Sequence, residues 1–334
     1  MPSVRRSQLL AARQVRPVSL RSLTSLLLAA ACTFGAGLPA LAAPLPQVSV
    51  SCGALRSLGE HEVAIWANSP QTALTLRNPS GGFLSTATRW VNVPVGSYLV
   101  TPSGVAEAAT RDGISMQARV TLSGGSTGRW RLDPNLKGAY TFAVSGGDLP
   151  ALGMAQRVGG INFAMHLGNA RAALGETIAT LEHLPFPTYV VPGNRDRYAD
   201  YVARTGPVRR DFAIGRDRFV VLDNADARVR QAQREWLAGR LRAFRSEGAR
   251  RVFVFMHWPL IDPRRGKHVQ MESSKEIRAL QRVFQEGGVS AVFASHIPIA
   301  NRSTRNGVDY HIVGPGHALV VRVQDDSLSV QTLP

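Results

Sequence analysis

Five short segments of the chain place a polar residue of a metal-ligating type directly after an apolar run. They are Ser145-Gly-Gly-Asp148, His166-Leu-Gly-Asn169, Pro192-Gly-Asn-Arg-Asp196, Phe255-Met-His257 and Ala294-Ser-His296. Each apolar run is typical of a buried strand, and open α/β sheets bind their ligands at the carboxyl ends of strands. Carboxylate, amide and imidazole groups are ligands of divalent metals. The pattern therefore predicts a metal site built from Asp148, Asn169, Asn194, His257 and His296.

The elements that would position these residues begin after residue 138, where apolar strands alternate with amphipathic stretches. We expect strands at 140–144, 161–166, 188–191, 219–222, 252–256, 289–293, 310–313 and 319–323. We expect helices at 170–183, 228–244 and 273–285. This alternation indicates a layered α/β domain whose sheets are covered on both faces.

The segment before it has a different pattern, which is typical of an all-β sandwich. Short runs recur at 48–51, 62–66, 72–77, 88–93, 97–101, 117–122 and 129–132, with turn residues between them. We expect three regions: a signal peptide at 1–42, an all-β domain of immunoglobulin or fibronectin type at 43–136, and the α/β domain at 137–334.

The N-terminus carries five arginines and no acid before an apolar run that begins at Leu23. Ala40-Leu41-Ala42 has the small-x-small form of a signal-peptidase site, so we expect an exported protein cleaved after Ala42. An uncleaved membrane anchor, a twin-arginine signal and a lipoprotein attached through Cys32 are the alternatives. Cleavage leaves Cys52 as the one cysteine, which excludes an internal disulfide.

The net charge of the chain is +16, of which the N-terminal arginines supply five, leaving about +11 after cleavage. Nearly all of this charge comes from arginine. The excess favours anionic substrates or association with an anionic cell envelope. No stretch interleaves arginines with aromatic residues, so we do not expect nucleic-acid binding. The oligomeric state is left open by the sequence.

The order of the five segments resembles the five motif blocks of the calcineurin-like metallophosphoesterase superfamily. Gly-Asp, Gly-Asn, Gly-Asn-Arg-Asp, Met-His-Trp-Pro and Ser-His-Ile-Pro follow one another as those blocks do, with Gln233 and Trp236-Leu237 on the intervening helix. With an all-β domain in front, the layout is similar to that of purple acid phosphatases. The resemblance implies a layered β-sandwich flanked by helices. It also implies an enzyme that hydrolyses phosphate esters with two metal ions.

Carried over by position, the resemblance assigns a role to each polar residue. Asp148 would bind the first metal, Asn169 occupies the position of the bridging aspartate, and Asn194, His257 and His296 would bind the second metal. The chain also departs from the family pattern at four further positions. Pro150 stands in place of a first-metal histidine, or of a glycine in the purple-type motif, and Pro298 stands in place of the last histidine, which would bind the first metal. Ala172 stands in place of a ligand tyrosine, and Arg195 in place of the catalytic histidine.

These departures predict a reduced site that holds one divalent ion or none. The donors that remain favour zinc on ligand type, with manganese or iron as alternatives. Arg195 would act as both the catalytic and the substrate-binding residue, because a guanidinium binds phosphate bidentately. We therefore expect an exported phosphoesterase with a mononuclear site. The alternatives are a non-catalytic descendant that binds a phosphorylated ligand or a partner protein, and an envelope-binding module carried by the β domain.

Overall fold

The computed structural model of the protein describes residues 45–333, except for residues 60, 102–105, 108, 148 and 170–172. The predicted signal peptide, Cys32, Asp148 and Ala172 lie outside these residues, so the predictions for them stay predictions. All described residues belong to one compact unit. Among them, no helix combines the length and the apolar character that crossing a membrane requires.

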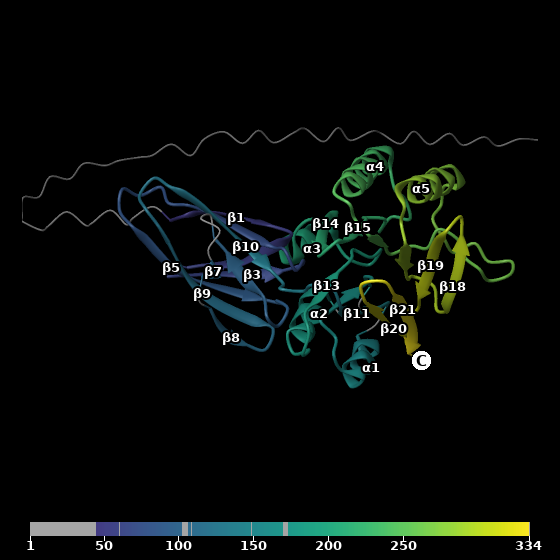
Figure 1. The fold of residues 1–334 in the computed structure, drawn as a ribbon, viewed down its shortest axis with the longest axis horizontal. Coiled ribbons are helices and arrows are strands. Elements are labelled where there is room, and N and C mark those ends of the chain that lie inside the picture. Colours follow the sequence, from purple (N-terminus) through teal and green to yellow (C-terminus); the bar gives the residue numbers. More distant parts are fainter. Residues whose placement is uncertain are drawn as a thin grey trace, which may run out of the picture. The chain divides into compact units, whose positions relative to one another are not determined.

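The first part of the described chain folds into two five-stranded sheets (Figure 1). One sheet has the order β1-β4-β10-β6-β7 and the other has the order β2-β3-β5-β9-β8. Their alternating side chains enclose a core that includes Trp90 and Trp130. The strands are β1 (Gln47–Ser51), β2 (Gly53–Leu58), β3 (Glu62–Ala67), β4 (Ala73–Arg77), β5 (Leu84–Val91), β6 (Tyr98–Val100), β7 (Ala106–Glu107), β8 (Thr110–Asp112), β9 (Ser115–Leu122) and β10 (Thr127–Asp133).

The rest of the chain forms two further sheets that pack face to face. The five-stranded sheet has the order β13-β12-β11-β20-β21, and the six-stranded sheet has the order β14-β15-β16-β17-β19-β18. The strands are β11 (Tyr140–Ser145), β12 (Phe163–His166), β13 (Thr188–Val190), β14 (Arg210–Ile214), β15 (Asp217–Val221), β16 (Arg251–Phe255), β17 (Ala291–Ala294), β18 (Ala300–Arg305), β19 (Val308–Val313), β20 (Ala318–Val323) and β21 (Leu328–Leu333).

Aromatic side chains fill the space between these two sheets. Phe142, Phe163, Phe219, Phe253 and Phe293 are all fully buried there. Phe142 and Phe163 come from one sheet and lie with ring centroids 5.3 Å apart, while Phe219 and Phe253 of the other sheet lie 5.2 Å apart. Burial of rings of this size dominates core energetics, so this layer holds the strand ends in register.

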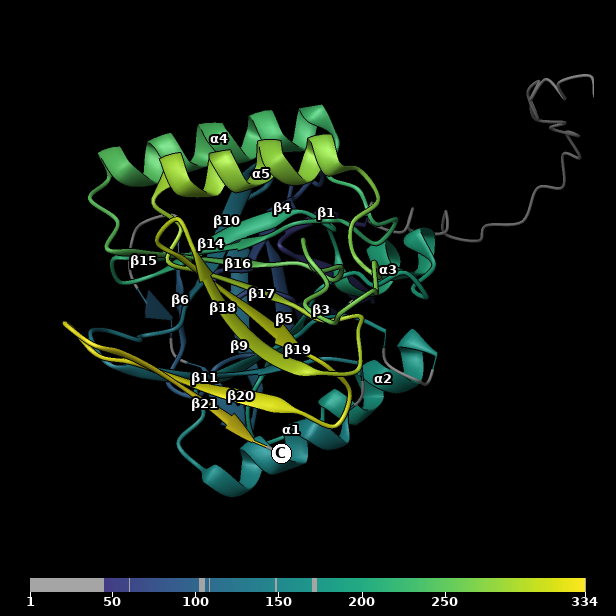
Figure 2. The ribbon, with the colours of Figure 1, turned by 90° about the vertical axis from the view of Figure 1, so that its right-hand side faces the viewer.

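Five helices cover the outer faces of the two sheets. They are α1 (Pro150–Val158), α2 (Leu174–Leu181), α3 (Tyr198–Thr205), α4 (Gln231–Ser246) and α5 (Ser274–Gly287). The helices α4 and α5 lie side by side over the six-stranded sheet, as both views show (Figures 1 and 2). The other helices pack against the five-stranded sheet.

The predicted fold class is confirmed: the protein is a mixed α/β structure with a layered β-sandwich flanked by helices. The predicted strands and the three predicted helices of this region are present, with ends shifted by a few residues. The structure adds α1, α3, β14, β18 and β21, which the sequence pattern did not indicate. The domain boundary at residue 136 stays a prediction.

Candidate functional site

The candidate ligands follow four strands that run parallel in pairs. In one sheet β12 pairs with β13, and in the other β16 pairs with β17. Asn169 and Asn194 come shortly after the first pair, and His257 and His296 shortly after the second pair. Because the carboxyl ends of parallel strands meet at the same edge, the fold can bring all four side chains together.

The four side chains do meet, around one ring nitrogen of His257. Nε2 of this ring lies 3.0 Å from Nδ2 of Asn169 and 3.0 Å from Oδ1 of Asn194. It lies 3.1 Å from Nδ1 of His296. Asn169 Nδ2 also donates to Asn194 Oδ1 at 2.5 Å. These four residues are called the His257 cluster below.

His257 is held in one orientation by the backbone around it. Its side chain is fully buried, and Nδ1 lies 2.6 Å from the carbonyl oxygen of Leu167. Because a carbonyl only accepts, this contact places the proton on Nδ1 and leaves the lone pair of Nε2 facing the cluster. Burial lowers the pKa of His257 to about 4, and the nearby positive charge of Arg195 acts in the same direction. The ring is therefore neutral and able to bind a cation at ordinary pH.

Asn169 is turned by a backbone donor, and this decides which of its atoms faces the cluster. The backbone N–H of Arg195 donates to Asn169 Oδ1 at 2.8 Å. The NH₂ group of Asn169 therefore faces Asn194 and His257, where it donates hydrogen bonds and offers no lone pair. Gly193 makes this contact possible, because a Cβ at that position would lie 2.5 Å from Asn169 Oδ1. The NH₂ group of Asn169, a hydrogen-bond donor without a lone pair, thus occupies the position of the bridging carboxylate.

His296 completes the cluster from a turn with a positive φ of 69°. Its ring stacks on Trp258, with centroids 3.3 Å apart and planes at 26°. Burial lowers the pKa of His296, and Arg195 contributes to this effect. Like His257, it presents a neutral imidazole nitrogen to the centre of the cluster.

Pro150 and Pro298, two of the departures at the first-metal positions, lie within the described residues. Pro150 is the first residue of α1, and Pro298 is exposed in the loop after β17. Neither side chain has a ligand atom. Within the described ranges, no group of three or more His, Cys, Asp or Glu residues is placed to hold a metal.

The atoms with free lone pairs that converge in the cluster could hold one divalent cation. Nε2 of His257, Nδ1 of His296 and Oδ1 of Asn194 are neutral donors that face a common point. Three protein ligands with an open position are the arrangement of a catalytic zinc site. A second cation would need a bridging anion to offset the repulsion between the ions, and Asn169 cannot supply one.

Arg195 adds a positive charge beside the cluster. Its side chain is exposed, and within the described part of the chain its guanidinium makes no hydrogen bond or ion pair. The guanidinium lowers the pKa of both cluster histidines, which places its charge within electrostatic reach of them. A free guanidinium at this position is suited to a phosphate oxygen.

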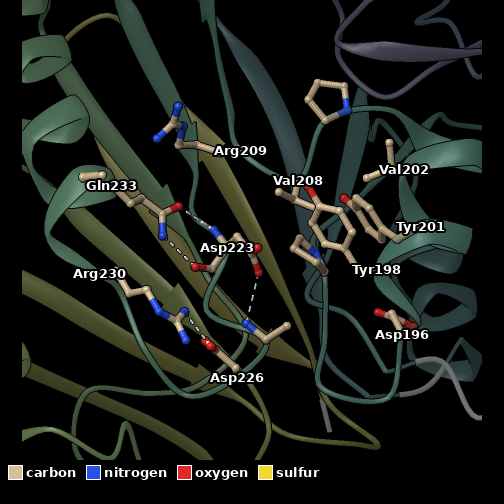
Figure 3. A pocket seen from close by; sticks show the side chains of 14 residues that line it. Asp196, Tyr198, Tyr201, Val202, Val208, Arg209, Asp223, Asp226, Arg230 and Gln233 are labelled. Carbon is tan, nitrogen blue, oxygen red and sulfur yellow. Dashed lines mark hydrogen bonds and ion pairs between the residues drawn. The ribbon is translucent and has the colours of Figure 1, made fainter. Parts of the chain in front are cut away.

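A cavity of about 700 Å³ adjoins the loops that carry the cluster (Figure 3). Asp196 lines the cavity from the loop of Asn194, and Asp223 lines it from the loop after β15. The neighbour of Asp223, Asn224, accepts from the backbone N–H of His257 at 2.7 Å. Asp196 was visible in the sequence motif of Asn194, but spacing alone did not indicate that it shares a cavity with Asp223.

The fold defined by this site and its sheets is that of a metallophosphoesterase-type protein. A purple acid phosphatase from yellow lupin (Lupinus luteus) seeds superposes with a TM-score of 0.51 and 11% sequence identity, over 85% of this chain and 72% of that chain. At this identity the likeness shows the fold alone.

Two further structures match the sandwich with lower scores. GAP50, the anchor in the inner membrane complex of Plasmodium, matches with a TM-score of 0.47 and 13% identity, over 59% of this chain and 85% of that chain. A dimetal phosphatase from Danio rerio matches with a TM-score of 0.45 and 12% identity, over 59% of this chain and 100% of that chain. No family model and no curated protein sequence matches the chain.

Proposed function

We propose that the protein hydrolyses phosphate esters at a single divalent metal ion held by Asn194, His257 and His296. The observation that carries this proposal is the convergence of three neutral ligand atoms, in which Oδ1 of Asn194 and Nδ1 of His296 lie 3.0 Å and 3.1 Å from Nε2 of His257. The metallophosphoesterase-type fold supports the reaction class, since the cluster lies where strand ends form the site in such a fold. A divalent cation bound there would polarise a phosphate oxygen and lower the pKa of a water molecule.

The residues of the chain divide the remaining work between them. Arg195 would bind the non-bridging oxygens of the phosphate and supply charge that a second metal would otherwise provide. The NH₂ group of Asn169 would donate to another phosphate oxygen. The carbonyl of Leu167 holds His257 in the tautomer that a metal requires. Zinc is the expected ion on ligand type, with manganese or iron next.

A second candidate function is the binding of a phosphorylated ligand without hydrolysis. One observation favours it: Asn169 donates to both Asn194 and His257, so the cluster can satisfy its own hydrogen bonds without a cation. The positive charge of Arg195 then opposes a metal and attracts an anion. In this case the protein would bind a phosphate group at the cluster without hydrolysing the ester.

Turnover by purified protein separates the two functions. The mature chain is assayed with a generic phosphomonoester and a phosphodiester in added zinc, manganese or iron. We expect turnover with at least one metal. Turnover should be lost in His257→Ala and in His296→Ala, of which the second changes a less buried side chain. His268→Ala, an exposed histidine outside the cluster, is the control and should keep full activity. Absence of turnover with every metal, together with phosphate binding, would support the second function instead.

We also propose that the protein is exported and that its substrates are met outside the cytoplasm, on the strength of its N-terminal charge and apolar pattern. N-terminal sequencing of protein recovered from the periplasm or medium is expected to read from Ala43. A chain that keeps residue 1, or that is lipidated at Cys32, would contradict cleavage after Ala42. The excess of basic residues favours association with an anionic envelope.

A further inference from the structure

The cavity beside the His257 cluster has two walls of different chemistry. One wall is aromatic and apolar and comes from α3 and residues 207–208; it includes Tyr198, whose side chain is 67% exposed. The opposite wall comes from the loop after β15 and the first turn of α4, and Asp223 lies at its centre (Figure 3). A volume of about 700 Å³ is in the range of small-molecule sites and far exceeds what a phosphate group needs.

Asp223 is fixed in place by its neighbours, yet part of its carboxylate is left for a ligand. The side chain of Gln233 accepts from the backbone N–H of Asp223 at 2.9 Å and donates to its carbonyl at 2.7 Å. One carboxylate oxygen accepts from the backbone N–H of Ala225 at 3.2 Å. Within the described residues, no protein group bonds the other oxygen and no arginine or lysine pairs with the carboxylate. A rigid acceptor of this kind loses little entropy on binding.

The arginines that line the cavity are engaged elsewhere. Arg230 pairs with Asp226 at 2.6 Å, and Arg209 lies over the ring of Trp236 at 4.6 Å. Among the described residues no lysine or arginine forms an ion pair with Asp223, in a chain that has 39 lysines and arginines against 23 acids. Burial raises the pKa of Asp223, and the nearby charge of Arg230 acts in the opposite direction.

We propose that this cavity binds the alcohol portion of the phosphate ester and that this portion carries an ammonium group, so the substrates are phosphate esters of amino alcohols. The ammonium donates to Asp223 and packs on the face of Tyr198, because a carboxylate and an aromatic face are complementary to an organic cation. The loop of Asn194 and Arg195 also supplies Asp196 to the cavity, which makes this cavity the candidate site for the ester group of a phosphate at the cluster. The substrate assignment rests on the proposed function; the binding of the cation does not.

Binding is measured by calorimetry with two phosphate esters of similar size, O-phosphoethanolamine and propyl phosphate. We expect wild-type protein to bind O-phosphoethanolamine on the order of tenfold more tightly, which is the effect of one hydrogen bond to a charged group. Asp223→Asn should abolish this preference while keeping the contact to Ala225. Asp326→Asn, which removes the same charge at an exposed turn, should keep it. Equal affinity of wild-type protein for the two esters would overturn the proposal.

A second arm separates this proposal from the failure of the proposed function. Ethanolamine alone, which has no phosphate, is titrated by saturation-transfer NMR against wild type, His257→Ala and Asp223→Asn. We expect binding to wild type and to His257→Ala, and none to Asp223→Asn. Tyr198→Phe should bind as wild type does and Tyr198→Ala more weakly, since Phe keeps the aromatic face. If the protein shows no turnover but still binds ethanolamine, the proposed hydrolysis is wrong and the cavity assignment stands. If wild type does not bind ethanolamine, or if Asp223→Asn still binds it, the cavity assignment is wrong.

Discussion

Asn169 presents its NH₂ group to the His257 cluster, because a backbone donor decides which atom of its amide faces inward. The backbone N–H of Arg195 donates to the amide oxygen of Asn169, and the NH₂ group of Asn169 donates to Asn194 and His257. An aspartate at the same position could accept from Arg195 with one oxygen and present the other to the cluster. Asn169 is therefore one of the positions that separate this cluster from a two-metal site, together with Pro150 and Pro298.

Asn169→Asp should raise the affinity of the cluster for zinc by on the order of tenfold, because an anionic oxygen replaces a donor next to the bound cation. In the metal-free state the same change should lower stability, since the carboxylate would face the lone pairs of His257 and Asn194. Equilibrium dialysis with zinc measures the first effect. Asn306→Asp, at an exposed turn, is the control for added charge. An unchanged zinc affinity would show that Asn169 does not face the metal.

His311 makes the stability of the fold depend on pH. The side chain is buried against Phe293, with ring centroids 5.1 Å apart, and its burial lowers the pKa to about 4. In the unfolded chain His311 takes up a proton near pH 6.5, whereas in the folded chain it takes up the proton only near pH 4. The unfolded state therefore binds more protons in this window, and stability falls as the pH falls through it.

His311→Phe should weaken this pH dependence, because phenylalanine keeps the ring contact and cannot take up a proton. Between pH 7 and pH 5 we expect His311 to account for a loss of at most about 2 kcal/mol in the free energy of unfolding. Urea unfolding at the two pH values measures it. His257 acts in the same direction, so the variant keeps part of the dependence. A variant with the full wild-type dependence would exclude His311 as a source.

At the scale of elements, the sheets of the first part of the chain protect an exposed edge of the second part. β13 is the edge strand of its sheet, with backbone groups that need partners. Asn92 donates to the carbonyl of Thr188 at 2.9 Å and accepts from its N–H at 2.7 Å, and Asn68 accepts from the N–H of Val190 at 2.8 Å. Arg210 donates to the carbonyl of Val190 at 2.7 Å. These side chains take the place of a neighbouring strand.

Asn92→Ala should lower the free energy of unfolding by about 3 kcal/mol, because it leaves buried backbone groups of Thr188 unpaired. Asn92 also has a positive φ of 69°, so the alanine adds about 1 kcal/mol of strain. Asn306→Ala, at an exposed turn with a φ of 51°, carries that strain without the buried bonds and is the matched control. Equal losses in the two variants would mean that the bonds to β13 contribute nothing.

The elements that the sequence pattern missed are those whose formation depends on their neighbours. β18 (Ala300–Arg305) has no large apolar residue and becomes a strand by pairing with β19. α1 is only nine residues long, begins with a proline at its first position and contains Gly153, so the sequence pattern did not indicate it. The central strands and α4 were predictable because apolar residues recur in them at a strand or helix period. The gathering of the cluster residues at strand ends was predictable for the same reason. The orientation of the Asn169 amide was not, because it is set by the backbone N–H of Arg195.

At the scale of the whole molecule, the sandwich brings four loops from two sheets to one point and places a cavity next to it. The same architecture could hold two metals, one metal or a phosphate alone. We propose that the His257 cluster holds one metal, because it has three neutral ligand atoms, no bridging carboxylate and a guanidinium nearby. The central claim is therefore a claim about number: one divalent ion per chain.

The most direct test counts zinc ions bound per chain at saturation, by equilibrium dialysis of the wild-type protein and of His257→Ala. The account predicts one ion per wild-type chain and none per chain of the variant, with circular dichroism showing that the variant is folded. His268→Ala should bind one ion, as wild type does. Two ions in wild type, none in wild type, or an ion retained by folded His257→Ala would contradict the account.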